Sequence, residues 1–279
     1  MNKKLVARVV PASHGIAWLV QSMSLLRAQP TRLLFITILM QFIMSLTQLP
    51  MVGLFVVISV PALSAGLLQA FRYTEQGGRP APAVLFKPLF SGSHSGRLLT
   101  LGALMFVLGM LTASFFLGGD EALLDPELLA RIEQGEVEAL AALDQGTLRR
   151  MLLAFLIGIS ISGTLSYMTI PLIWFQNRKI FPALGEGLRA LVANWKPFTV
   201  LGLGLMALLV PVGLVAGVLA MLAGSAGLLS IILVGLVMIL VLAFQLMLFG
   251  TQYCAFRDIF GLETESMQPV RGDGNHFVA

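Results

Sequence analysis

Long stretches without a charged residue constrain the fold of this 279-residue chain more than any other feature. These stretches cover residues 33–71, 98–118, 151–177 and 197–256. A helix needs about 20 apolar residues to cross the hydrocarbon core of a bilayer, and each stretch is long enough to do so. Only 11% of the residues are charged, against about 25% in an average soluble domain. The sequence therefore predicts an all-α integral membrane protein.

The first and last stretches are too long for one span, so each is expected to turn within itself. Gln48-Leu49-Pro50 is a polar and proline break in the first, and residues 223–227 are a run of small residues in the last. Both compositions suit turns. A single kinked helix over the first stretch is the alternative, because proline often only bends a membrane helix. The expected arrangement is three hairpins of transmembrane helices, six in all, at about residues 32–48, 51–71, 98–118, 150–173, 198–223 and 227–250.

Basic residues are distributed unequally between the two sides of these spans. All but three of the 18 Lys and Arg residues lie before the first span, between the second and third, between the fourth and fifth, or after the sixth. The loop at 119–149 is instead rich in acids. By the positive-inside rule, both termini lie in the cytoplasm and the acidic loop lies outside. We expect one membrane domain over residues 1–261 and a flexible cytoplasmic tail over 262–279.

Each predicted hairpin is preceded by a cytoplasmic segment of mixed polarity. Apolar side chains recur at helical spacing over 184–195, with charged side chains on the opposite face, which predicts an amphipathic helix in the membrane interface. A less regular stripe covers 16–26, where Trp18 interrupts the polar face. Residues 84–90 combine aromatic residues, a lysine and a proline, but they are too few to assign by periodicity. The predicted partner of these segments is a bilayer with anionic headgroups.

One tripeptide occurs twice, as Ala70-Phe71-Arg72 and as Ala255-Phe256-Arg257. Both copies are predicted at the cytoplasmic end of a returning helix. Phenylalanine would then lie at the membrane boundary, and arginine would reach headgroup phosphates. We interpret the recurrence as a membrane anchor and not as an active-site signature.

Helix packing has its own pattern in the fifth span. Gly213, Gly217, Ala220 and Gly224 lie on one helical face, and small residues let helices approach closely in membranes. Packing within the chain is favoured over a dimer interface, although the oligomeric state itself is not predicted.

Chemically active residues are scarce. The predicted spans contain no ionisable side chain at depth, where such residues usually perform a function. Their polar residues are amides and hydroxyls, most of them suited to bonds between or within helices. The fourth span is the richest, over residues 160–167, so a polar cavity would lie there. His14, His94 and His276 have no second ligand at i+3 or i+4, and no metal site, cofactor or catalytic residue is predicted.

The acidic outer loop could bind a protein, the alternative being a solvated cap. Nucleic acid is not an expected partner, because the basic residues are dispersed among membrane segments and are not concentrated on a soluble domain.

A set of structural motifs extends over most of the chain. They are Trp18, Pro30, Leu49-Pro50-Met51-Val52-Gly53, Pro61-Ala62-Leu63-Ser64-Ala65-Gly66, Phe71-Arg72, Asn194-Trp195-Lys196-Pro197 and Ala255-Phe256-Arg257. With them the chain resembles an uncharacterised family of proteobacterial multi-pass inner-membrane proteins, a domain of unknown function. The paired helices are more distantly similar to membrane domains attached to some glycerophosphodiester phosphodiesterases, but phosphodiesterase residues are absent here. The resemblance implies a bacterial inner membrane and supplies no activity.

The sequence favours a non-enzymatic scaffold, assembly or regulatory factor that acts through its basic cytoplasmic face and acidic outer loop. The alternative is a facilitator or channel for a small polar solute or a lipid, with a path beside the fourth span. An intramembrane enzyme is the third hypothesis. It would need an interfacial site assembled from residues such as His14, His94 or Glu186.

Overall fold

The computed structural model describes residues 7–118, 131, 143–223 and 228–262. Over these residues the chain is helical and contains no strand. Most of the acidic loop and the tail after residue 262 lie outside the described residues. The elements are α1 (His14–Ala28), α2 (Pro30–Ser45), η1 (Leu46–Gln48), α3 (Pro50–Glu75), η2 (Pro82–Leu85), η3 (Lys87–Phe90), α4 (Ser93–Leu117), α7 (Gln145–Gln176), α8 (Ile180–Ala193), α9 (Trp195–Ala223) and α10 (Leu228–Phe260).

Six helices in the described part of the chain are long and apolar enough to cross a membrane. This confirms the expected all-α, multi-pass composition. The break at Gln48-Leu49-Pro50 is also present: α2 ends at Ser45, Leu49 is extended, and Pro50 begins α3. The first stretch is therefore two helices and not one kinked helix. The long helices are α2, α3, α4, α7, α9 and α10.

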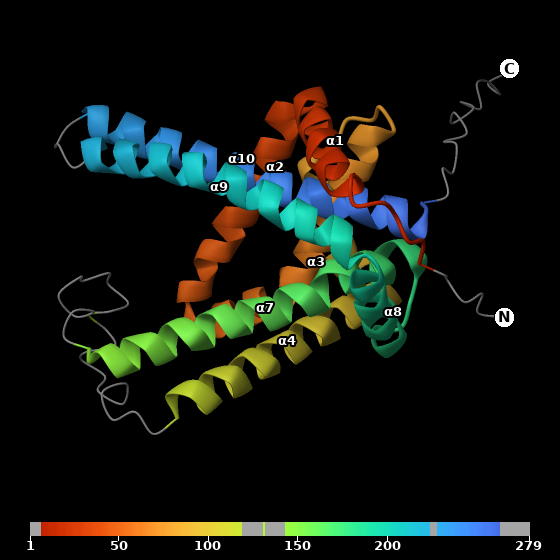
Figure 1. Cartoon of the computed structure of the whole chain (residues 1–279), viewed down its shortest axis with the longest axis horizontal. Coiled ribbons are helices and arrows are strands. Elements are labelled where there is room, and N and C mark those ends of the chain that lie inside the picture. Colours follow the sequence, from red (N-terminus) through yellow and green to blue (C-terminus); the bar gives the residue numbers. More distant parts are fainter. Residues whose placement is uncertain (1–6, 119–130, 132–142, 224–227, 263–279) are drawn as a thin grey trace, which may run out of the picture.

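Two pairs of neighbouring helices dominate the arrangement. α4 lies beside α7, and α9 lies beside α10, while α3 contacts both pairs and α1 packs against α9 and α10. Figure 1 shows the two pairs diverging with distance from α8. One end of the bundle contains the starts of α4 and α9 and the last residues of α3, α7 and α10. Because α8 also lies there, we call it the α8 end.

Burial is concentrated at the α8 end. Trp18, Phe71, Tyr253 and Phe256 are almost fully buried there. Farther along α9, large apolar side chains such as Met221 are exposed. Exposed apolar side chains are expected on helices whose surroundings are lipid and not water.

The packing face of α1 differs from the one expected. Trp18 and Ser22 are fully buried, whereas Ile16 and Val20 of the predicted apolar stripe are exposed. Gly250 of α10 faces the Ser22 side chain so closely that a Cβ there would overlap it. The face of this helix that was predicted to be polar, with Trp18 as an interruption, is thus the face that packs against the bundle.

The small-residue face of α9 is a second correction. None of the described atoms lies within 4 Å of a Cβ placed at Gly213 or Gly217. The prediction that this face packs within the chain is therefore wrong at these two positions. Close approach occurs instead at Gly102 of α4, where a Cβ would overlap the backbone of Ile58 in α3.

Substitution of Gly102 tests this close contact. Gly102→Ala should lower the free energy of unfolding by about 1–3 kcal/mol, because the added methyl group has no space beside α3. Gly96→Ala on the same helix is the matched control, since a Cβ there meets nothing within 4 Å and alanine favours a helix. Thermal unfolding of both purified variants in detergent is the measurement. Equal stability of the two would contradict the contact.

The start of α7 provides a pH-dependent prediction. Asp144 Oδ1 accepts hydrogen bonds from the backbone N–H groups of Gly146 (2.7 Å) and Thr147 (3.1 Å), and Oδ2 accepts one from Thr147 Oγ1 (2.6 Å). The bonds from Thr147, then that from Gly146, hold the pKa of this carboxyl below its ordinary value of 3.8. A lowered folded-state pKa stabilises the helix start above pH 3.8, and this contribution disappears as the pH falls through the folded-state pKa.

Hydrogen exchange in the first turn of α7 measures this contribution. Protection should fall on acidification in the wild type and should be low at every pH in Asp144→Ala. Asn at the same position is an equally good N-cap without a titrating charge, so Asp144→Asn should remain protected across the range. The same acid sensitivity in Asp144→Asn would exclude the carboxylate as the cause.

Candidate functional site

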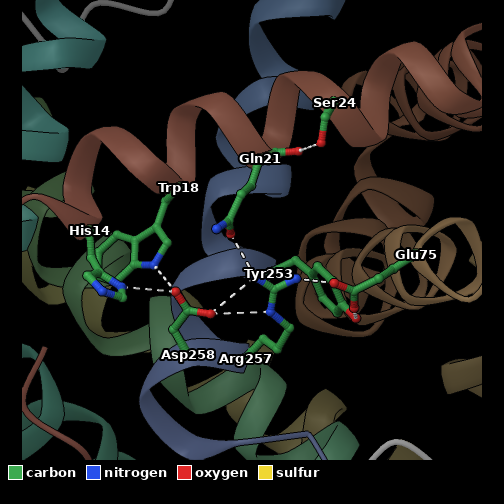
Figure 2. Close-up of polar contacts among 8 residues, drawn as sticks. All are labelled: His14, Trp18, Gln21, Ser24, Glu75, Tyr253, Arg257 and Asp258. Atoms are coloured by element: carbon green, nitrogen blue, oxygen red, sulfur yellow. Dashed lines mark hydrogen bonds and ion pairs between the residues drawn. The ribbon is translucent and has the colours of Figure 1, made fainter.

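A polar cluster joins three helices at the α8 end, with Arg257 of α10 at its centre (Figure 2). The Arg257 guanidinium binds the Glu75 carboxylate of α3 and donates to Gln21 Oε1 of α1 at 2.7 Å. It also bonds to Asp258 Oδ1, at 3.1 Å from Nη2 and 3.2 Å from Nε. One cation is therefore shared between two carboxylates and an amide.

The two carboxylates extend the cluster to aromatic side chains. Asp258 Oδ2 accepts from Trp18 Nε1 at 2.9 Å and lies 3.2 Å from His14 Nδ1. Tyr253 Oη donates to Glu75 Oε2 at 2.5 Å. Each acid therefore pairs with Arg257 through one oxygen and with a neutral or histidine donor through the other. This arrangement connects α1, α3 and α10, which are far apart in the sequence.

The charged groups of the cluster are engaged with one another and with neighbouring donors. Both carboxylates are occupied by donors, and the described residues contain no group of three His, Cys, Asp or Glu side chains that could hold a metal ion. Arg257 and Asp258 keep only about a quarter and a sixth of their side-chain surface exposed. Charged groups at such positions are favourable only when they are paired and hydrogen-bonded.

This cluster corrects the anchor interpretation of the recurring tripeptide. Phe71 and Phe256 are fully buried inside the protein and therefore present no side-chain surface to a membrane boundary. Arg257 is held inside the chain, and Arg72 lies over the Phe175 ring at 5.5 Å. The acids beside the arginines were the missed signal: Glu75 follows Arg72 within one helical turn, and Asp258 directly follows Arg257.

The other residues considered for an interfacial site are not brought together. The imidazole of His94 meets the edge of Trp174, with 5.8 Å between ring centroids. Glu186 pairs with Arg178 at 3.2 Å, whereas His14 pairs with Asp258. His276 lies outside the described residues.

Two cavities flank α7 at the polar segment singled out in the sequence. The first, of about 400 Å³, lies between α3, α4 and α7, and Ser162 and Ser166 line it. The second, of about 580 Å³, lies between α7, α8, α9 and α10, and Thr164 and Tyr167 line it. The two cavities therefore lie on different sides of the 160–167 segment. Most of the remaining wall of both cavities is apolar.

The first cavity follows the helix axes over a long distance. Its lining extends from Gly102 to Met110 on α4 and from Ser162 to Ile170 on α7. At 1.5 Å per residue these lengths correspond to about 12 Å along each helix. Ser166 Oγ also donates to the Gly163 carbonyl of its own helix at 3.3 Å, as expected for a hydroxyl in an apolar helix.

A double-mutant cycle on Arg257 and Glu75 tests the polar cluster. Arg257→Gln should lower the free energy of unfolding by about 1.5–3 kcal/mol, because hydrogen bonds to charged groups are lost. Glu75→Gln leaves Arg257 its bond to Asp258 and should cost less. Thermal or denaturant unfolding in detergent measures both single variants and the double variant. Strictly additive effects would show that the two side chains do not interact.

Comparison with known proteins adds no relative: no protein-family model, curated protein or solved structure matches this chain.

Proposed function

We propose that the protein is a non-enzymatic scaffold, assembly or regulatory factor of a bacterial inner membrane. The observation that carries this proposal is that ionisable groups at the α8 end bind one another. Glu75, Asp258 and Arg257 bind one another across helices, and Glu186 binds Arg178. Such pairing holds these side chains in place and gives a fixed surface for contact with a partner.

The proposed topology has three hairpins, with both termini and the α8 end in the cytoplasm. The support is the charge distribution: Lys179, Arg189 and Lys196 are exposed at the α8 end, whereas the acids gather in the loop at 119–149. Reporter fusions after residue 262 and within 119–142 test it. A reporter active only in the cytoplasm should work after residue 262 and fail within the loop. The opposite result would invert the topology.

α8 is proposed to lie in the cytoplasmic membrane interface. Its small residues Ala183, Gly187 and Ala190 are buried, and α8 packs against α7. Two of its large apolar residues point elsewhere: Phe181 and Val192 are 81% and 65% exposed. An amphipathic helix with an uncovered apolar face and flanking cations suits an anionic bilayer surface.

Photo-crosslinking in cells tests the scaffold role. A photoreactive amino acid at Arg189 should give a reproducible adduct with a partner protein at the α8 end, and one at Glu133 tests a partner of the acidic loop. Val218 is the matched control, because it is exposed on the apolar surface of α9 and should meet only lipid. Recovery of no protein above the Val218 background at either position would count against the scaffold.

The two cavities beside α7 favour a second candidate, a facilitator for a small polar solute or a lipid. Their position on both faces of the hydroxyl-rich segment supports it. Purified protein in proteoliposomes should then accelerate the flux of a suitable solute or the exchange of a labelled lipid between leaflets. Rates equal to those of protein-free vesicles for both cargo classes would reject this candidate.

A further inference from the structure

A third cavity lies at the α8 end, beside the segment that joins α3 to α4. Its volume of about 620 Å³ is within the range of small-molecule sites. Two basic residues, Arg79 and Lys87, and three aromatic residues, Tyr73, Phe86 and Phe90, are part of its lining. None of the described acidic residues lines it. The cavity therefore combines positive charge with aromatic surface.

The segment that forms this cavity is fixed to the bundle. η2 packs against α3 and α2, and η3 packs against α3 and α4. Leu85 of η2 is fully buried. Gly66 of α3 approaches the Leu85 backbone so closely that a Cβ at Gly66 would overlap it. The walls of the cavity therefore have defined positions before any ligand binds.

The two basic residues that line the cavity have no acidic partner among the described residues. Arg79 and Lys87 are exposed, and the ion pairs of the described residues involve other cations. Glu75, the nearest acid in the sequence, is held by Arg257. Lys87 Nζ instead donates to Tyr73 Oη at 3.3 Å. The cavity therefore carries positive charge that an anion would neutralise.

The apolar part of the wall narrows the class of anion. Val84 and Phe86 line the cavity together with Phe90, whose side chain is 84% exposed. Inorganic phosphate would neutralise the charge and leave this apolar surface in contact with water. A phosphate that carries an apolar group would also cover the surface, which is favourable.

The place of the cavity along the spans points to the same class. It lies where the candidate span 51–75 ends and the candidate span 93–117 begins. The ends of membrane-spanning helices lie at the level of the lipid headgroups, where aromatic and basic residues interact with them. A phospholipid brings a phosphate and an apolar body to this level.

We propose that the cavity beside η2 and η3 binds one anionic phospholipid. Its phosphate contacts Arg79 and Lys87, and its glycerol backbone and first acyl carbons cover Val84 and Phe90. The ammonium group of a zwitterionic lipid would be repelled by the same two cations, so an anionic headgroup is preferred. This inference is independent of the scaffold role and of the side of the membrane that the α8 end faces, and both would survive its failure.

Native mass spectrometry of the full-length protein in detergent tests the site. Phosphatidylglycerol and phosphatidylethanolamine with identical chains are titrated separately and then mixed in equal amounts. The wild type should retain one phosphatidylglycerol molecule in preference to phosphatidylethanolamine, and equal retention would overturn the anionic assignment. Glycerol 3-phosphate in large excess carries the phosphate without acyl chains and should leave the lipid bound. Displacement of the lipid would overturn the lipid as the ligand in favour of a soluble phosphate ester.

Four substitutions of exposed basic residues test the phosphate contact. Lys87→Gln and Arg79→Gln should each reduce the preference for phosphatidylglycerol about fivefold, the attraction of one basic residue to an anionic lipid surface. Lys196→Gln and Arg32→Gln are the matched controls, because these residues are also exposed and do not line the cavity. The same preference in all four variants would overturn the contact.

A pair of phenylalanine variants tests the apolar part of the site. Phe90→Ala should weaken phosphatidylglycerol binding at least about threefold, because part of the ring would no longer be covered by the lipid. Phe181→Ala on α8 is the matched control, since Phe181 is 81% exposed and does not line the cavity. Both rings are largely exposed, so neither substitution removes a core contact. Equal affinity of the two variants would overturn the location.

Discussion

The shared cation at Arg257 is the interaction on which the rest of the structure depends. Isolated, Arg257, Glu75 and Asp258 would each be costly in a poorly solvated place. Together they compensate one another and recruit Gln21, Trp18 and Tyr253 as neutral partners. Breaking one pair would leave an uncompensated charge. This penalty fixes the relative positions of α1, α3 and α10 at the α8 end.

Aromatic packing surrounds and supports this cluster. Phe71 stacks against Tyr253 with 6.5 Å between ring centroids, and Phe256 lies 5.8 Å from Phe175. The same rings pack beside the ion pairs, in which Arg257 and Glu75 keep 26% and 31% of their side-chain surface exposed. The opposite ends of the long helices lack such a core and diverge (Figure 1).

Several features were predictable because they depend on local chemistry. The length of each uncharged stretch predicted the long helices, and the polar and proline break at residues 48–50 correctly separated α2 from α3. The hydroxyl-rich segment at 160–167 was where a polar cavity was predicted; two cavities lie beside it, but their walls are mostly apolar. Other features depended on which residues meet. The arginine of the second tripeptide was assigned to headgroups because its partner Glu75 lies far away in the chain, and no local pattern showed that they pair.

The sequence by itself determined the number and approximate extent of the apolar helices. Backbone N–H and C=O groups in lipid must be hydrogen-bonded within the protein, and a long apolar stretch satisfies them by forming a helix. Tertiary structure alone decided which faces turn inward. In a helix that is apolar on all sides, periodicity does not distinguish a face that contacts lipid from one that contacts protein. Gly213 therefore looked like a packing residue yet has open space, whereas Gly102 contacts the backbone of α3. Steric fit between helices made that distinction, and the charges at Glu75, Arg257 and Asp258 fixed the end at which the helices meet.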